Sequence, residues 1–160
     1  MLQFWQRRFN MSIRFNAPKQ QQTKVTILKA SDFNFVSDAA ITSNTYVPVV
    51  SKTFTPTLTN ADIFVEVYAV SSVNGSGNDD WFTNVTWNNN EIGYNHEVFA
   101  TTYSGGSRTS NLFPLVGSWY NVNTTPYTLA VNARRGTSDD TLTVKADGSF
   151  YVKITEASRV

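Results

Sequence analysis

Cysteine is absent from this sequence, and histidine occurs once. The lack of cysteine excludes a disulfide framework, a thiolate metal site and a cysteine nucleophile. A zinc site would have to combine His96 with carboxylates alone, which is a poor ligand set. No stretch approaches the roughly 18 apolar residues of a membrane helix, and Arg7 and Arg8 interrupt what would be the apolar part of a secretion signal. We therefore expect neither a metal nor a membrane partner.

Carboxylates are missing from the first 29 residues, which carry six of the 13 basic residues. The remaining seven basic residues stand against all 12 acidic ones, so a basic N-terminal segment precedes a mildly acidic body. Such an asymmetry indicates an acidic partner for the segment, either nucleic acid or an acidic protein surface. Basic residues are not interleaved with the aromatic residues of the body, as they are in many nucleic-acid interfaces. We therefore expect no nucleic-acid partner.

Helix signals are scarce, whereas Thr, Val, Asn, Phe and Tyr are common, and these β-branched and aromatic residues suit half-buried strands. Short β-rich runs separated by turn residues every eight to twelve positions are typical of a sandwich or barrel. Strands are predicted at residues 45–51, 62–72, 80–87, 97–103, 118–122, 126–135, 141–145 and 149–155. Residues 16–24 resemble a linker, and residues 24–36 form a weaker β stretch.

The last third of the chain has the clearest alternation. Successive strand residues point to opposite faces. In one strand the residues predicted to face inward are Tyr127, Leu129, Val131 and Ala133, and in the last strand they are Phe150, Val152 and Ile154. The pair Asp147-Gly148 predicts a hairpin turn. Pro48 predicts an edge strand or a bulge, because proline cannot donate to a sheet ladder.

Residues that could carry chemistry are few. His96 stands beside a turn with no nucleophile elbow elsewhere, and we interpret it as a surface residue. The pairs Asp79-Asp80 and Asp139-Asp140 lie in turn-rich segments, where aspartate side chains close local turns. We expect no catalytic residue, no metal site and no cofactor, and so a protein that is not an enzyme.

Aromatic residues are the remaining candidates for recognition. Trp81 and Trp87 share a face of one predicted strand, and we assign them to the core. Tyr94, Tyr103 and Tyr120 lie near turns and are predicted to form an exposed recognition surface, for example for a glycan.

One series of segments goes beyond composition. It comprises "FTPTLTNADIFVEVYAVSS", "WFTNVTWNNNEIG", "YTLAVNARRGTSDDTLTV" and "GSFYVKITE", within residues 46–157. This series resembles the jelly-roll modules of bacteriophage virion proteins, which include capsid decoration (cement) proteins and the heads of tail fibres. The resemblance implies a jelly-roll-like antiparallel β-sandwich that is displayed on the virion surface and often forms trimers. We predict an arm and linker at residues 1–45 and the sandwich at residues 46–160.

The arm is predicted to be an anchor. Its middle alternates apolar and polar residues, so that one side of a strand could bury against a neighbouring subunit by β-augmentation. The alternative is that this segment is the first strand of the sandwich's own sheet. The predicted docking residues are Arg7, Arg8, Phe9, Met11, Ile13, Arg14, Phe15, Lys19 and Lys24.

Three functions are compatible with these sequence features. The first is a non-enzymatic decoration protein whose arm docks on the major capsid protein or other virion subunits and whose sandwich projects outward, as a homotrimer. The second is the receptor-binding head of a fibre that recognises host-surface glycans. The third is a carbohydrate-binding module or a fragment of a glycan-active enzyme.

Overall fold

The computed structural model describes residues 20–75, 79–99, 106–136, 141–147 and 149–159. Within these ranges the chain is built from strands, with a single short 3-10 helix, η1. The elements are β1 Thr23–Lys29, η1 Ala30–Phe33, β2 Ala39–Ile41, β3 Val47–Phe54, β4 Ala61–Gly75, β5 Asp79–Trp87, β6 Asn90–Phe99, β7 Gly106–Val122, β8 Tyr127–Arg135, β9 Thr141–Val144 and β10 Tyr151–Ser158.

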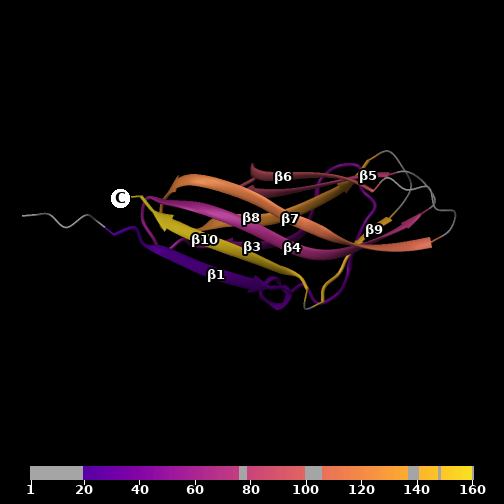
Figure 1. The fold of residues 1–160 in the computed structure, drawn as a ribbon, viewed down its shortest axis with the longest axis horizontal. Helices are drawn as coiled ribbons and strands as arrows, with labels where there is room; N and C mark the ends of the chain where they lie inside the picture. The colour runs from indigo at the N-terminus through magenta and orange to yellow at the C-terminus, as the bar shows by residue number, and fades with distance from the viewer. Residues whose placement is uncertain (1–19, 76–78, 100–105, 137–140, 148, 160) are drawn as a thin grey trace, which may run out of the picture.

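The strands form two packed sheets (Figure 1). Sheet A has the order β1-β10-β4-β9-β2. In it, β10 and β9 pair with successive lengths of one edge of β4, and β7 pairs with the other edge. Sheet B has the order β3-β8-β5-β6. Apart from the short strands β2 and β9, this gives two four-stranded sheets, β1-β10-β4-β7 and β3-β8-β5-β6, which is the jelly-roll arrangement. Every pairing among the described strands is antiparallel. The predicted jelly-roll-like β-sandwich is confirmed.

The core lies between the sheets and follows the predicted alternation. Leu129 and Ala133 of β8 are fully buried, as are Val152 and Ile154 of β10, which lie opposite Val67 and Val65 of β4. Trp87 is also fully buried and packs edge-on against Phe54. The assignment of Trp87 to the core is confirmed, whereas the side chain of Trp81 lies outside the described residues.

The turn between β5 and β6 is shorter than the separator expected from the asparagine-rich sequence. Trp87 pairs with Asn90, so only Asn88 and Asn89 form the turn, with φ values of 48° and 65°. Asparagine tolerates this left-handed region better than most residues, and two such residues in succession fit a two-residue hairpin. The Oδ1 atom of Asn88 also accepts a hydrogen bond from the backbone N–H of Thr128 at 2.7 Å, and this bond links the turn to β8.

Pro48 behaves as its chemistry requires. It lies in β3, which is the terminal strand of sheet B, and the register of β3 against β8 shifts between Pro48 and Val50. Both the edge position and the irregularity are confirmed.

The domain boundary predicted between residues 45 and 46 is wrong. Strand β1 pairs with β10 along its whole length, from Thr23 opposite Ala157 to Lys29 opposite Tyr151, and Leu28 joins the core. Strand β2 pairs with β9. The sandwich therefore includes β1, which satisfies the hydrogen-bonding edge of β10 that faces away from β4.

The predicted hairpin at Asp147-Gly148 is also wrong. Strands β9 and β10 do not pair with each other; both pair antiparallel with β4, β10 along residues 61–68 and β9 along residues 71–74. The connection between them therefore continues along one side of the long strand β4 rather than reversing the chain.

Candidate interaction surface

The structure describes only some of the residues predicted for recognition. The docking residues from Arg7 to Lys19, and also Tyr103, lie outside the described residues. Tyr94 is in β6, opposite Asn84, but its side chain is not described. Tyr120 lies in β7 and is 58% exposed. Lys24 is exposed and lies in β1, opposite Glu156 of β10. The predicted arm residue Lys24 is thus part of sheet A.

The chain enters the sandwich beside its own C-terminus, at the left of Figure 1. The backbone N–H of Gln22 donates to Ser158 Oγ at 2.8 Å, and the Ser158 N–H donates to the carbonyl of Gln22 at 2.8 Å. Arg159 donates from Nε to Asp62 Oδ1 at 2.7 Å and lies 6.0 Å from the ring centroid of Tyr120. Tyr120 therefore lies near the C-terminus at the end of sheet A where the N-terminal segment leaves, but on β7, with β10 and β4 between it and β1.

A buried carboxylate organises the loop at this end of the molecule. Glu156 is 0% exposed, and its Oε2 accepts the backbone N–H groups of Thr57 at 2.6 Å and Leu58 at 2.9 Å. The Thr57 hydroxyl donates to the same carboxylate at 3.2 Å. Because a buried charge is costly unless it is hydrogen-bonded, these donors explain how Glu156 is accommodated in a strand whose neighbouring inward residues are apolar. Sequence patterning alone places Glu156 on the inward side but does not identify its partners.

The outer face of sheet A carries apolar side chains next to this end. Val25 and Ile27 of the edge strand β1 are 52% and 47% exposed, and Phe64 of β4 is 38% exposed. They share one face with Tyr120, because Val25 and Phe64 both flank Thr155 and Phe64 lies opposite Ser118 of β7. We call Val25, Ile27, Phe64 and Tyr120 the arm-side patch. Exposed apolar residues that are grouped on one face are typical of an interaction site.

Beside the arm-side patch, the outer face carries a group of paired polar and aromatic side chains. The Lys153 Nζ and Glu66 Oε2 atoms are 2.5 Å apart, and the Tyr68 hydroxyl donates to Glu66 Oε1 at 3.1 Å. The Tyr68 and Tyr151 rings stack with centroids 4.4 Å apart. The hydrogen bond from Lys153 holds the pKa of Glu66 below its ordinary value, and the hydrogen bond to Glu66 raises the pKa of Tyr68. These charges compensate each other, so the patch itself is apolar rather than basic or acidic.

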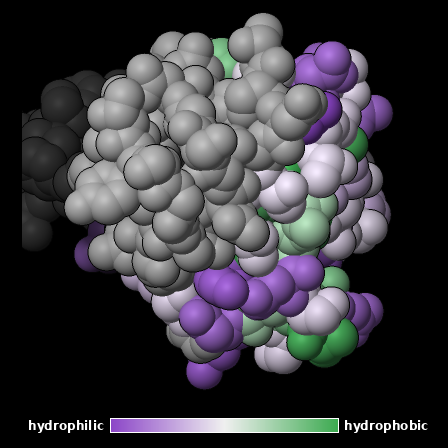
Figure 2. Space-filling view, turned by 90° about the vertical axis from the view of Figure 1, so that its right-hand side faces the viewer, coloured by the Kyte–Doolittle hydropathy of each residue, from purple (hydrophilic) through white to green (hydrophobic). Residues whose placement is uncertain are grey.

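A small pocket lies at the far end of β1. It has a volume of about 390 Å³ and is lined by both apolar and polar residues. Phe150 forms part of its wall and packs edge-on against Phe35. The lining residues are Lys29, Ala30, Ser31, Phe35, Val36, Ala146, Asp147 and Phe150. Figure 2 views the molecule from the right-hand side of Figure 1 and shows hydrophilic side chains next to a small hydrophobic area at the lower edge.

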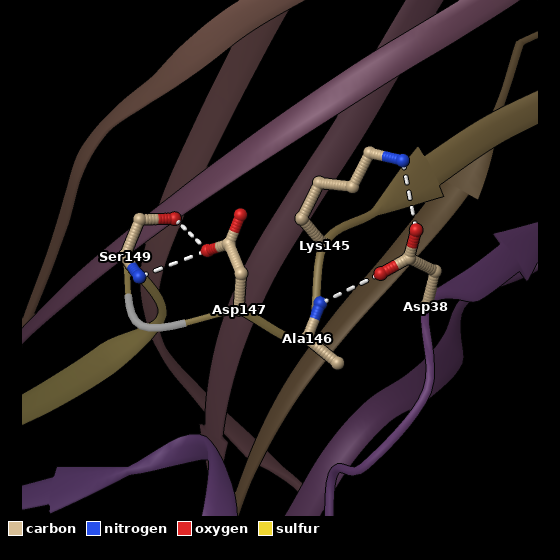
Figure 3. Close-up of polar contacts among 5 residues, drawn as sticks. All are labelled: Asp38, Lys145, Ala146, Asp147 and Ser149. Atoms are coloured by element: carbon tan, nitrogen blue, oxygen red, sulfur yellow. Dashed lines mark hydrogen bonds and ion pairs between the residues drawn. The ribbon is translucent and has the colours of Figure 1, made fainter.

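Two local carboxylate contacts shape the loop beside this pocket (Figure 3). Asp38 accepts from Lys145 Nζ at 2.8 Å and from the Ala146 N–H at 3.0 Å, and the lysine contact is the main reason that the Asp38 pKa is lowered. Asp147 Oδ1 accepts from the Ser149 hydroxyl and from its backbone N–H, which lowers the Asp147 pKa. These contacts close the turn, so the carboxylates have a structural explanation.

Within the described residues, no group of three or more histidine, cysteine or acidic side chains is placed to hold a metal ion. The part of the chain that the structure describes also contains no helix long and apolar enough to cross a membrane.

No protein family and no curated protein sequence matches this chain. Among solved structures, dimeric latent PorU from Porphyromonas gingivalis aligns over 86% of this chain with 10% identity and a TM-score of 0.44. The T=1 particles derived from infectious bursal virus align over 87% with 11% identity and a TM-score of 0.41, and the T13 particle of IBDV over 92% with 14% identity and 0.37. The chain spans 13%, 36% and 39% of the respective matched chains. These identities and scores are too low to support an argument about function.

Proposed function

We propose that this chain is a virion structural protein, specifically a capsid decoration protein that docks on the shell through its N-terminal arm and the arm-side patch. The observation that carries the proposal is the exposure of Val25, Ile27, Phe64 and Tyr120 on one face of sheet A, the sheet that the arm enters at β1. The jelly-roll topology and the resemblance of residues 46–157 to phage virion modules support the same class. Because many functions share this fold, the proposal depends on the surface.

The arm and the patch complement each other chemically. The arm supplies cations and an alternating apolar stripe of four residues, Phe9, Met11, Ile13 and Phe15. The patch supplies a preformed apolar surface whose side chains are between 38% and 58% exposed. Covering a side chain that is about half exposed contributes roughly 1 kcal/mol, half of the value for full burial. An arm that loses entropy on ordering needs such additional contacts.

The arm's binding mode is part of the proposal. Strand β1 is a sheet edge, but exposed Lys24 and Lys29 lie near its two ends. Lysine on an edge strand opposes pairing with another strand, and it also repels a basic arm. The arm of one subunit is therefore expected to add to an edge on an acidic partner subunit and not to β1 of another copy.

The test is co-sedimentation of the purified protein with empty shells of its virus. We expect deletion of residues 1–19 to abolish binding and Ile27→Glu to weaken it at least tenfold, while Val36→Glu, at an 85% exposed position outside the patch, leaves it unchanged. All three variants should melt like the full chain, since none removes a residue of the described strands. Equal binding by the deletion variant and the full chain would refute the arm's role.

We propose further that the protein is a homotrimer without enzymatic activity. Exposed apolar surface favours association, and light scattering would measure the mass at high micromolar concentration. A monomer under these conditions contradicts the trimer in solution.

For activity, His96→Ala should leave shell binding within about threefold of the original. If the original protein hydrolyses a substrate and this variant does not, the protein is not purely structural.

A further inference from the structure

The outer face of sheet B carries an ordered set of polar side chains that the proposed function does not use. Val85 and Trp87 of β5 point into the core, so the alternate residues of β5 and of its partner β8 line the opposite face. Phe82 lies opposite Arg134, Asn84 opposite Asn132, and Thr86 opposite Ala130.

Arg134 is held in place by aromatic rings. Its guanidinium carbon lies 3.6 Å from the ring centroid of Phe82 and 5.2 Å from that of Tyr46. Within the described part of the chain, Arg134 forms no ion pair with a carboxylate, and its hydrogen bond is from Nη1 to the Arg135 carbonyl at 3.4 Å. A guanidinium that lies over a ring face keeps its N–H donors in its own plane, where they do not point into the ring. The site therefore presents a fixed, planar set of donors that matches a carboxylate.

The next row along the strands is a network of amides. Asn132 Nδ2 donates to Asn84 Oδ1 at 2.9 Å and to Thr86 Oγ1 at 3.2 Å. Asn84 Nδ2 donates to Glu91 Oε2 at 2.8 Å, and Asn84 is only 5% exposed. The network fixes the orientation of the partly exposed groups around it, Asn132 Oδ1 and the Thr86 hydroxyl, which suit the hydroxyl groups of a ligand.

From this geometry we propose that the outer face of sheet B binds a sugar acid, with the carboxylate on Arg134 and the ring hydroxyls on Asn132, Thr86 and Glu91. The distance from the Phe82–Arg134 row to the Thr86 row is four residues along a strand, or about 13 Å. That length accommodates one or two sugar rings. The proposal goes beyond shell docking and is independent of it, because the site is on the other sheet.

The charges on this face favour a carboxylate over a phosphate or a nucleic acid. Among the described side chains of this face, Arg134 is the one guanidinium, the amides of Asn84 and Asn132 are uncharged, and Glu91 is exposed at the far end. A polyanion gains affinity by contacting several cations, and it would be repelled by Glu91. A singly charged ligand whose remaining groups are hydroxyls avoids both problems.

The experiment uses the full-length protein and titrates methyl β-D-glucuronide, with methyl β-D-glucoside as the neutral control and inorganic phosphate as the competing anion. NMR shifts of the protein report binding. We expect the glucuronide to bind with a dissociation constant on the order of 1 mM and the other two compounds to bind at least tenfold more weakly.

Variants locate the binding site. Arg134→Gln should weaken glucuronide binding about tenfold or more, because charge-assisted hydrogen bonds are lost. Arg134→Lys preserves the charge but not the planar donor pair, so it should also weaken binding several-fold. Lys145→Gln, which removes a cation paired with Asp38 in the loops next to β2 and β9, is the matched control and should not alter binding. Thermal melting checks that each variant is folded.

Four outcomes would overturn the proposal: no glucuronide binding, equal binding of the glucoside, tighter binding of phosphate, or unchanged affinity in folded Arg134→Lys and Arg134→Gln proteins. A negative result here does not contradict the proposed shell docking, because docking is measured separately, by co-sedimentation of variants in sheet A and the arm.

Discussion

Glu156 is expected to contribute more to folding stability than any exposed carboxylate on the same sheet. Its side chain is fully buried at the end of β10 and accepts two backbone N–H groups and one hydroxyl from residues 57 and 58. These contacts hold the loop between β3 and β4 against sheet A. The informative changes are Glu156→Ala, which removes every acceptor, and Glu156→Gln, which preserves the volume and one oxygen.

The expected loss of folding free energy follows from the hydrogen bonds that Glu156 accepts. A hydrogen bond to a charged group contributes about 1.5–3 kcal/mol, and a buried donor left without a partner costs about 1–3 kcal/mol. For Glu156→Ala, two orphaned N–H groups and a small cavity together predict a loss of about 3–5 kcal/mol. Glu156→Gln retains one acceptor but turns an amide donor toward N–H donors, so we expect a loss of about 1–3 kcal/mol.

Urea unfolding at neutral pH, followed by tryptophan fluorescence, measures these losses. For a chain of this size, each kcal/mol lowers Tm by about 2–4 °C, so Glu156→Ala should melt roughly 6–20 °C earlier. The matched control is Glu66→Gln, which breaks the ion pair with Lys153 on the outer face of sheet A. That pair is partly exposed, and we expect a loss below about 1 kcal/mol. Equal losses for Glu156→Gln and Glu66→Gln, or a loss below about 1 kcal/mol for Glu156→Ala, would refute the reasoning.

Three further predictions concern the turn, the core and acid stability. Asn89→Gly should raise the free energy of unfolding by a few tenths of a kcal/mol to about 1 kcal/mol in urea titrations, because glycine adopts φ near 65° without steric cost; a loss of stability would contradict this. Phe150→Ala should cost about 3–5 kcal/mol in the same titrations, since Phe150 is 1% exposed, whereas Val36→Ala, at an 85% exposed position, should cost less than about 0.5 kcal/mol. Folding lowers the pKa of Asp38 and Asp147, so their contribution to stability is present above the unfolded pKa of about 4 and is lost as the pH falls through the folded pKa. Tm measured from pH 7 to pH 2 should therefore fall mainly below pH 4, and less steeply in Asp38→Asn; identical slopes would rule out a contribution from the Asp38–Lys145 pair.

The strands of the last third could be predicted because their residues alternate strictly. Leu129, Val131 and Ala133 face the core as predicted, and Pro48 lies at a sheet edge as its missing N–H requires. The two-residue turn at Asn88-Asn89 was harder to locate, since three consecutive asparagines and Glu91 look equally polar in sequence. The pairing of Trp87 with Asn90 fixes it.

The candidate surfaces were only partly predictable. Tyr120 was identified as exposed and proves to be so, but Val25 and Ile27 were assigned to a weak β stretch near a linker. A short edge strand has one buried face at most, and here it contributes Leu28 inward and two apolar residues outward. No local pattern distinguishes such a strand from a linker; its pairing with β10, more than 120 residues away in the chain, makes it part of the sheet.

The sequence by itself determined the all-β class, the inward faces of β8 and β10, the absence of thiol chemistry and the basic character of the arm. These features follow from residue type and a period of two, which are local properties. The tertiary structure decided what depends on long-range pairing. It placed β1 at the edge of sheet A, set β9 and β10 along one side of β4, brought residues 57 and 58 to the Glu156 carboxylate, and stacked Arg134 on Phe82. The physical reason is that strand partners and side-chain contacts are fixed by the closure of two sheets over one core, and the pattern within any single strand is compatible with several partners.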